Sequence, residues 1–92
     1  EIETYLQEHP SVAGCQVVAV NLAGRMRAVA FITLEPEREF QEELLIDYCR
    51  DGLAGYKAPA RVFELVEFPV THSANGTKIQ RARLREWASE WT

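Results

Sequence analysis

Hydrophobic positions recur along the chain with two different spacings, and the wider spacing predicts three helices. In three segments apolar side chains return every three or four residues, which places them on one face of a helix. These segments are residues 2–9, 40–53 and 78–91. In the second, acidic residues lie opposite an apolar face that consists of Phe40, Leu44, Tyr48, Cys49 and Leu53. In the third, the apolar face consists of Leu84, Trp87, Ala88 and Trp91.

Three shorter segments are rich in apolar and β-branched residues and predict strands at residues 12–20, 28–34 and 62–66. The middle segment, "AVAFITL", is apolar at nearly every position, which indicates a strand buried on both faces. Gly24 lies between the first two strands and favours a hairpin there. The order helix–strand–strand–helix–strand–helix predicts the α+β class, with helices packed on a small sheet of about three strands. Residues 1–92 are enough for a single domain with one modest core.

The stretch "SANGTKIQRARLR", residues 73–85, contains both a turn and a predicted helix start. Asn75 and Gly76 tolerate positive φ and therefore predict a turn. Thr77, followed three residues later by Gln80, is typical of a capping box, so we expect the last helix to begin with Lys78. The start of a helix carries partial positive charge and disfavours cations. A lysine at this place therefore needs an explanation other than helix stability.

Charge narrows the possible partners. The net charge of −4 argues against a dedicated nucleic-acid binder. Residues 1–54 hold ten acids and four bases, whereas residues 55–92 hold four acids and six bases. The basic surplus lies in the half of the chain that contains Lys78, where it either attracts an anionic ligand or forms a solvated face. No apolar run approaches the ~20 residues of a membrane helix, and no signal peptide is evident, so we expect a cytoplasmic protein without a membrane span.

The cysteines and histidines give no strong indication of a disulfide or a metal site. Cys15 and Cys49 lie in apolar surroundings, which favours buried free thiols in a reducing compartment and leaves a disulfide open. His9 and His72 have no cysteine or carboxylate partners at metal-ligand spacing. We therefore predict no metal site.

Three motifs in order resemble one family across the whole chain. "EIETYLQEHPSVAGCQVVAV" resembles a segment that follows an interdomain hinge, "LAGYKAPARV" is similar to a G-Y-K-x-P loop, and "FPVTHSANGTKIQR" resembles a P-x-T-x-S-G-K-I-x-R loop. Together they are typical of the small C-terminal domain of the adenylate-forming ligases, which include acyl- and aryl-CoA synthetases, luciferases and peptide-synthetase adenylation domains. The order and spacing of the three motifs make the resemblance specific.

The resemblance implies a catalytic role for Lys78. In this family the loop lysine enters the active site of a large N-terminal adenylation domain, where it contacts the substrate carboxylate and the α-phosphate of ATP. A carboxylic acid and Mg-dependent ATP give acyl-AMP and pyrophosphate. The C-terminal domain then rotates, and a thiol, usually that of coenzyme A, attacks the adenylate. The resemblance therefore implies ATP and coenzyme A as substrates of the full-length enzyme, and none bound by this chain alone.

The loop at residues 55–61 resembles the part of the family that shapes the thiol tunnel. Tyr56 is expected to pack against pantetheine or adenine, or to anchor the loop in the core. Lys57 is a candidate phosphate contact or a solvated residue. The remaining candidate binding residues implied by the resemblance are Gly55, Arg61 and Gly76.

The sequence departs from the family pattern in three places. Thr77 stands between Gly76 and Lys78, which lengthens the loop and puts Thr71 farther along the chain from the lysine. An Ala-Gly-Arg stretch at residues 23–25 replaces a common Trp-Gly-Glu, so an aromatic platform for adenine is missing. Alanines at positions 58 and 60 replace frequent cations beside the loop proline. The last two changes weaken the case for the familiar coenzyme A contacts, and Arg25, Arg27 and Arg61 are the candidates to compensate for them.

Three functions remain open. The first is the C-terminal domain of an ATP-dependent acyl-CoA synthetase. The second is an adenylating ligase that uses a carrier-protein thiol or no coenzyme A. The third is an inactive interaction module of the same fold. The chain lacks an initiator Met and opens on Glu1 already in helical pattern, which favours a piece of a longer enzyme. The acid that is activated stays open, because the acyl pocket lies in the N-terminal domain of this family.

Overall fold

The computed structural model describes residues 2–54 and 57–92, and it confirms the α+β class. Within this part of the chain the helices and strands follow one another as α1 (Ile2–Gln7), β1 (Val12–Leu22), β2 (Arg25–Leu34), α2 (Glu42–Gly52), β3 (Arg61–Glu64), β4 (Val70–Ser73), β5 (Gly76–Ile79) and α3 (Arg81–Trp91).

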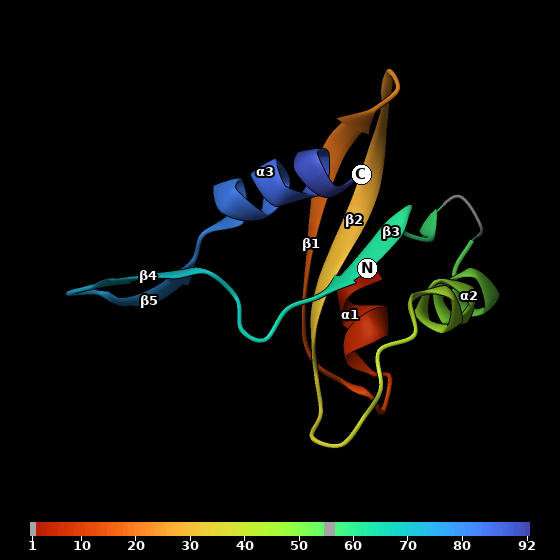
Figure 1. The fold of residues 1–92 in the computed structure, drawn as a ribbon, viewed down its shortest axis with the longest axis horizontal. Coiled ribbons are helices and arrows are strands. Elements are labelled where there is room, and N and C mark those ends of the chain that lie inside the picture. The colour runs from red at the N-terminus through yellow and green to blue at the C-terminus, as the bar shows by residue number, and fades with distance from the viewer. Residues whose placement is uncertain (1, 55–56) are drawn as a thin grey trace.

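A three-stranded sheet forms the centre of the molecule, in the order β1-β2-β3 (Figure 1). Strand β1 pairs antiparallel with β2, and β2 pairs parallel with β3. The central strand is buried on both faces, as predicted, because Val29, Ala30, Phe31 and Ile32 each expose 0% of their surface. Successive residues of a strand point to opposite faces, so this run contributes to two separate cores.

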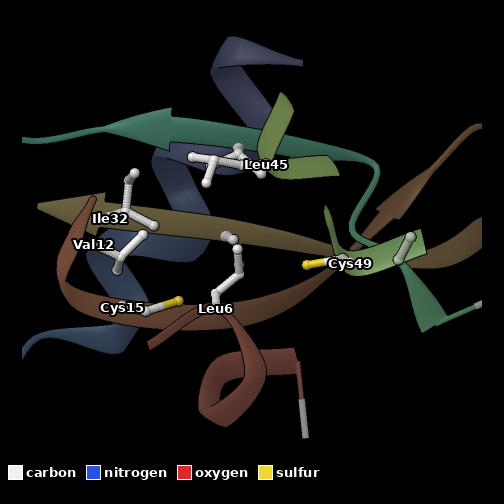
Figure 2. Close-up of a cluster of buried hydrophobic side chains, with 9 residues drawn as sticks. Leu6, Val12, Cys15, Ile32, Leu45 and Cys49 are labelled. Carbon is white, nitrogen blue, oxygen red and sulfur yellow. The ribbon is translucent and has the colours of Figure 1, made fainter. Parts of the chain in front are cut away.

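The first core lies between the sheet and helices α1 and α2. In Figure 2, Leu6 of α1, Cys15 of β1 and Cys49 of α2 point toward one another. Both thiols are free. Burial is the main cause that raises the pKa of Cys15 to about 12 and that of Cys49 to about 11, so neither is an activated nucleophile.

The second core lies under α3 on the opposite face. Leu84 and Ala88 of this helix are fully buried against Val18, Val29 and Phe31. The predicted apolar face of α3 is thus confirmed at Leu84, Trp87 and Ala88, whereas Trp91 exposes 43% of its surface. A stack of Trp87 on Trp91, with ring centroids 5.3 Å apart, continues that face toward the end of the helix.

The predicted apolar face of α2 needs a correction. Leu45 and Cys49 are buried, whereas Leu44 exposes 54% of its surface. The helix begins at Glu42, so Phe40 lies before it. The buried residues of the helix are Leu45 and Cys49, which are four residues apart and therefore share one face. None of the described helices is long and apolar enough to cross a membrane.

Candidate functional site: the β4–β5 hairpin and its base

Lys78 lies in a strand, and the predicted capping box at Thr77 is wrong. Residues 76–79 form β5, which pairs antiparallel with β4, and the last helix begins only at Arg81. The two strands form a hairpin that projects away from the rest of the molecule (Figure 1). Residues 71–78 are all exposed. Lys78 is therefore presented on an exposed arm, and its backbone lies before the helix, which begins at Arg81.

Local sequence explains why the arm is a hairpin. Ser73 pairs with Gly76, which leaves a two-residue turn at positions 74–75. Gly76 has φ +116°, a conformation that favours glycine, and no atom lies within 4 Å of where its Cβ would stand. Glycine is thus required here by the backbone, and the predicted binding role of Gly76 stays a prediction. The Ser73 hydroxyl donates to the Gly76 carbonyl at 3.1 Å and tightens the turn.

The hairpin brings Thr71 opposite Lys78. The two residues are register partners, and directly opposed side chains in an antiparallel pair lie close together on one face. The longer loop therefore does not separate them in space, contrary to what their sequence distance indicates. Sequence reasoning missed this pairing, although a turn at positions 74–75 would have fixed the register.

A shallow groove of about 440 Å³ runs from this face of the hairpin to the start of α3. Three cations line it, Lys78, Arg81 and Arg83, together with one acid, Glu86. The groove is therefore positively charged overall and suits an anionic group.

The two arginines of the groove stand in the first turn of α3, where cations cost about 0.3–1 kcal/mol. Each makes hydrogen bonds that offset this cost. Arg81 donates to Gln16 Oε1 at 2.8 Å and to the carbonyl oxygen of Val17 in β1. Arg83 Nε donates to Gln80 Oε1 at 3.0 Å. These contacts join the base of the hairpin to the sheet and to the helix.

The second group of predicted residues lies around the loop that precedes β3. Gly55 and Tyr56 fall outside the described residues. Lys57 is half-buried, and its backbone N–H donates to the Ala54 carbonyl at 2.8 Å. Their predicted binding roles stay predictions.

Arg61 is engaged within the domain. Its Nε and Nη2 donate to the Glu42 carboxylate at 2.6 and 3.3 Å, and the Val62 backbone N–H donates to the same carboxylate at 2.9 Å. Desolvation opposes ionisation of Glu42, but the hydrogen bonds from Arg61 and Val62 hold its pKa below the usual value. The bonds to Glu42 also raise the pKa of Arg61. This ion pair ties α2 to the end of the loop.

The two predicted regions do not form one site. The hairpin with Lys78 and Gly76 and the loop with Lys57 and Arg61 lie toward opposite ends of the long axis of the molecule (Figure 1). The described residues contain no group of three His, Cys, Asp or Glu side chains that could hold a metal ion.

The family of the chain follows from comparison with known proteins. The family of AMP-binding enzyme C-terminal domains matches residues 1–75. The chain belongs to this family, and it is a C-terminal domain of the adenylate-forming ligase superfamily. The family match ends before Lys78. A long-chain-fatty-acid–CoA ligase of Escherichia coli matches more of the chain, with 34% identity over 88 residues, 96% of this chain and 15% of that protein.

Solved structures share the fold. An acyl-CoA synthetase of Brucella canis is 31% identical with a TM-score of 0.79, over 97% of this chain and 17% of that one. An amide bond synthetase of Marinactinospora thermotolerans is 29% identical with a TM-score of 0.82, over 94% of this chain and 17% of that one. The chain spans only about 15% of the length of the curated relatives it matches.

Proposed function

We propose that this chain is the C-terminal domain of an ATP-dependent acyl-CoA ligase, in which Lys78 is the adenylation lysine. The observation that carries the proposal is the exposed position of Lys78 on a projecting hairpin, beside a groove that contains two further cations. The fold and the family support the same assignment. An arm of this shape suits insertion into an active site supplied by an N-terminal adenylation domain.

The first half-reaction joins two anions. The carboxylate of the acid attacks the α-phosphate of ATP, which enters as its magnesium complex, and pyrophosphate leaves. An ammonium between the carboxylate and the α-phosphate lowers their repulsion and stabilises the charge that develops on the phosphoryl oxygens. Lys78 supplies this group when the arm is inserted. Thr71, directly opposite, offers a hydroxyl beside it.

The second half-reaction uses a different surface of the domain. The described end of the loop, residues 57–60, lies toward the other end of the molecule from the hairpin (Figure 1). One domain thus presents the hairpin for adenylation and this loop for thiol transfer after a rotation. Lys57 is the candidate phosphate contact in this loop, and Tyr56 the candidate pantetheine contact. The Glu42–Arg61 ion pair fixes the end of the loop, which favours a supporting role for Arg61.

The group that attacks the acyl-adenylate has a second candidate besides coenzyme A, because the loop offers few cations for the phosphates of coenzyme A. Ala58 is buried in the first core, and Arg61 is committed to Glu42. One structural relative is an amide bond synthetase. A carrier-protein thiol or an amine is therefore the alternative to coenzyme A. Product formation from acyl-adenylate, with coenzyme A compared against pantetheine, a carrier protein and a simple amine, separates these cases. Equal rates with coenzyme A and pantetheine would mean that the nucleotide end of coenzyme A makes no contact that matters.

The proposal for Lys78 is tested by measuring the half-reactions separately. In the full-length enzyme, Lys78→Ala is expected to slow pyrophosphate release by about 10²–10³-fold, the loss typical of removing one preorganised stabilising group. Thioester formation from pre-formed acyl-adenylate is expected to stay within about twofold. Lys78→Arg is expected to rescue poorly, because a planar fork cannot replace a compact ammonium. Arg85→Ala, an exposed cation of α3, is the matched control. Equal loss in both half-reactions would contradict the proposal.

The domain is not expected to act alone. The described residues supply one candidate catalytic side chain, and the acid and ATP need a second domain. Purified residues 1–92 with ATP and a panel of carboxylates should release no pyrophosphate above background. Robust turnover by this piece would show that the assignment of roles is wrong.

A further inference from the structure

Gln80 is the residue through which the Lys78 arm is joined to the helix that follows. Its backbone N–H donates to the Pro69 carbonyl at 2.9 Å, just before β4 begins. Its backbone carbonyl accepts from the N–H groups of Arg83 and Leu84 at 3.1 and 3.3 Å, in the first turn of α3. The backbone of Gln80 thus closes the hairpin on one side and starts the helix on the other.

The side chain of Gln80 also joins the hairpin to α3. Nε2 donates to the Val70 carbonyl at 2.9 Å, and Oε1 accepts from Arg83 Nε at 3.0 Å. The two partners fix the orientation of the amide, because a carbonyl only accepts and a guanidinium only donates. Gln80 is half-buried, and it stands two residues from Lys78.

Arg81 continues the connection to the sheet. Its guanidinium bonds to Gln16 and to the Val17 carbonyl in β1. The arm itself is exposed from residue 71 to residue 78, and only Val70 and Ile79 at its base are half-buried. The direction of the arm therefore depends on the contacts at its base.

We propose that Gln80 is a positioning residue for Lys78: its amide holds the base of the arm at a fixed angle to α3 and so determines where the ammonium stands when the arm is inserted. The inference rests on the proposed adenylation role of Lys78. Displacements of about 1 Å at a reacting centre cost on the order of 100-fold in rate. Lys78 stands in the strand pair next to the base of the arm, two residues from Gln80, so a shift of the backbone at Gln80 displaces the lysine directly.

Two substitutions of Gln80 test the hydrogen bonds made by its side-chain amide. Gln80→Ala removes both side-chain bonds. Gln80→Glu keeps the length and the acceptor for Arg83, but it loses the donor and places a carboxylate against the Val70 carbonyl. In the full-length enzyme we expect both variants to slow pyrophosphate release by about 10- to 100-fold, with thioester formation from pre-formed acyl-adenylate unchanged within about twofold. Arg85→Ala should leave both rates unchanged.

A double-mutant cycle distinguishes positioning from a general structural role. If Gln80 acts only through Lys78, adding Gln80→Ala to Lys78→Ala should slow adenylation no further. A further tenfold loss in the double variant, an equal loss in both half-reactions, or full activity of Gln80→Ala or of Gln80→Glu would each overturn the inference. If Lys78→Ala itself leaves adenylation intact, the proposed function fails instead. A loss in Lys78→Ala without one in Gln80→Ala contradicts only the present inference.

Discussion

The sheet with its three helices and the β4–β5 hairpin differ in how they are held together. The sheet and helices bury two cores, one on each face of β2. The hairpin buries almost nothing, and its contacts are strand pairing, short polar bonds around the turn and the connection at its base. Stability is thus concentrated in one region, and the candidate chemistry lies in the other. Exposed segments with few buried contacts are those that move most easily, which suits the proposed insertion of this arm into another domain.

The largest effect on stability is expected from Leu84→Ala in the second core. Leu84 exposes 0% of its surface and packs with Val18, Val29 and Phe31. Removing a buried leucine side chain costs about 2–5 kcal/mol, because apolar contacts are lost and a cavity remains. Urea unfolding followed by tryptophan fluorescence measures this loss. Arg85→Ala, on the exposed side of the same helix, should stay within about 0.5 kcal/mol. A loss below about 1 kcal/mol for Leu84→Ala would break the contrast between core and arm.

A smaller loss is expected from Gly52→Ala at the end of α2. Alanine is the better helix former by about 1 kcal/mol, so propensity alone predicts stabilisation. The new Cβ would stand 1.5 Å from the Tyr5 hydroxyl and 1.9 Å from its Cζ, and Tyr5 packs on Tyr48 with ring centroids 4.6 Å apart. Overpacking of this kind costs about 1–3 kcal/mol. The cost of the clash should therefore exceed the gain in helix propensity, and the urea midpoint of unfolding of Gly52→Ala should be lower than that of the unchanged protein.

The control is a second substitution at Tyr5, the residue that the new Cβ would contact. Tyr5→Ala removes the ring and leaves space for the new Cβ at position 52. In that background Gly52→Ala should be neutral or stabilising. An equal loss in both backgrounds would show that the cost arises from the helix end itself.

A pH-dependent effect is expected from Glu42→Gln. Hydrogen bonds from Arg61 and Val62 lower the pKa of Glu42 below its usual 4.5, so its contribution to stability is present above about pH 4.5. It is lost as the pH falls through the lower folded value. Because the Arg61 side chain is 42% exposed, screening limits the contribution to about 0.5–1 kcal/mol at pH 7. Thermal unfolding from pH 7 to pH 3 should show the two proteins converging at low pH. A constant difference would rule out the carboxylate charge as the cause.

The sequence predicts the buried region better than the arm, and burial is the reason. The "AVAFITL" run and the stripe of Leu84 and Ala88 are predictable because a core forces a periodic pattern. The error at Leu44 has the opposite origin. Leu44 and Leu45 are both apolar, and which one is buried depends on the angle at which α2 meets the sheet. No local pattern contains that angle.

The arm has no core to force a pattern, so a local signal led to the wrong element. Thr77 and Gln80 have the spacing of a capping box, but residues 70–73 pair with residues 76–79 and take Thr77 into a strand. Lys78 is nevertheless a candidate by resemblance, because its place in a motif does not depend on secondary structure. Gln80 was missed because its contacts reach back ten residues to Val70.

The smallest effect is expected from Thr77→Val, on the face of the hairpin opposite to Lys78. The change removes the 3.1 Å contact between Thr77 Oγ1 and His72 Nδ1 but keeps a β-branched side chain suited to a strand. Both residues are exposed, so water replaces the lost bond and the free energy of unfolding should change by less than about 0.5 kcal/mol. Adenylation should also be unchanged, because the Gln80 connection stays intact. The same urea titration and pyrophosphate assay check both points. A loss of adenylation without a loss of stability would mean that the face of the arm opposite to Lys78 also positions this lysine. The contacts at the base of the arm would then not be sufficient to position it.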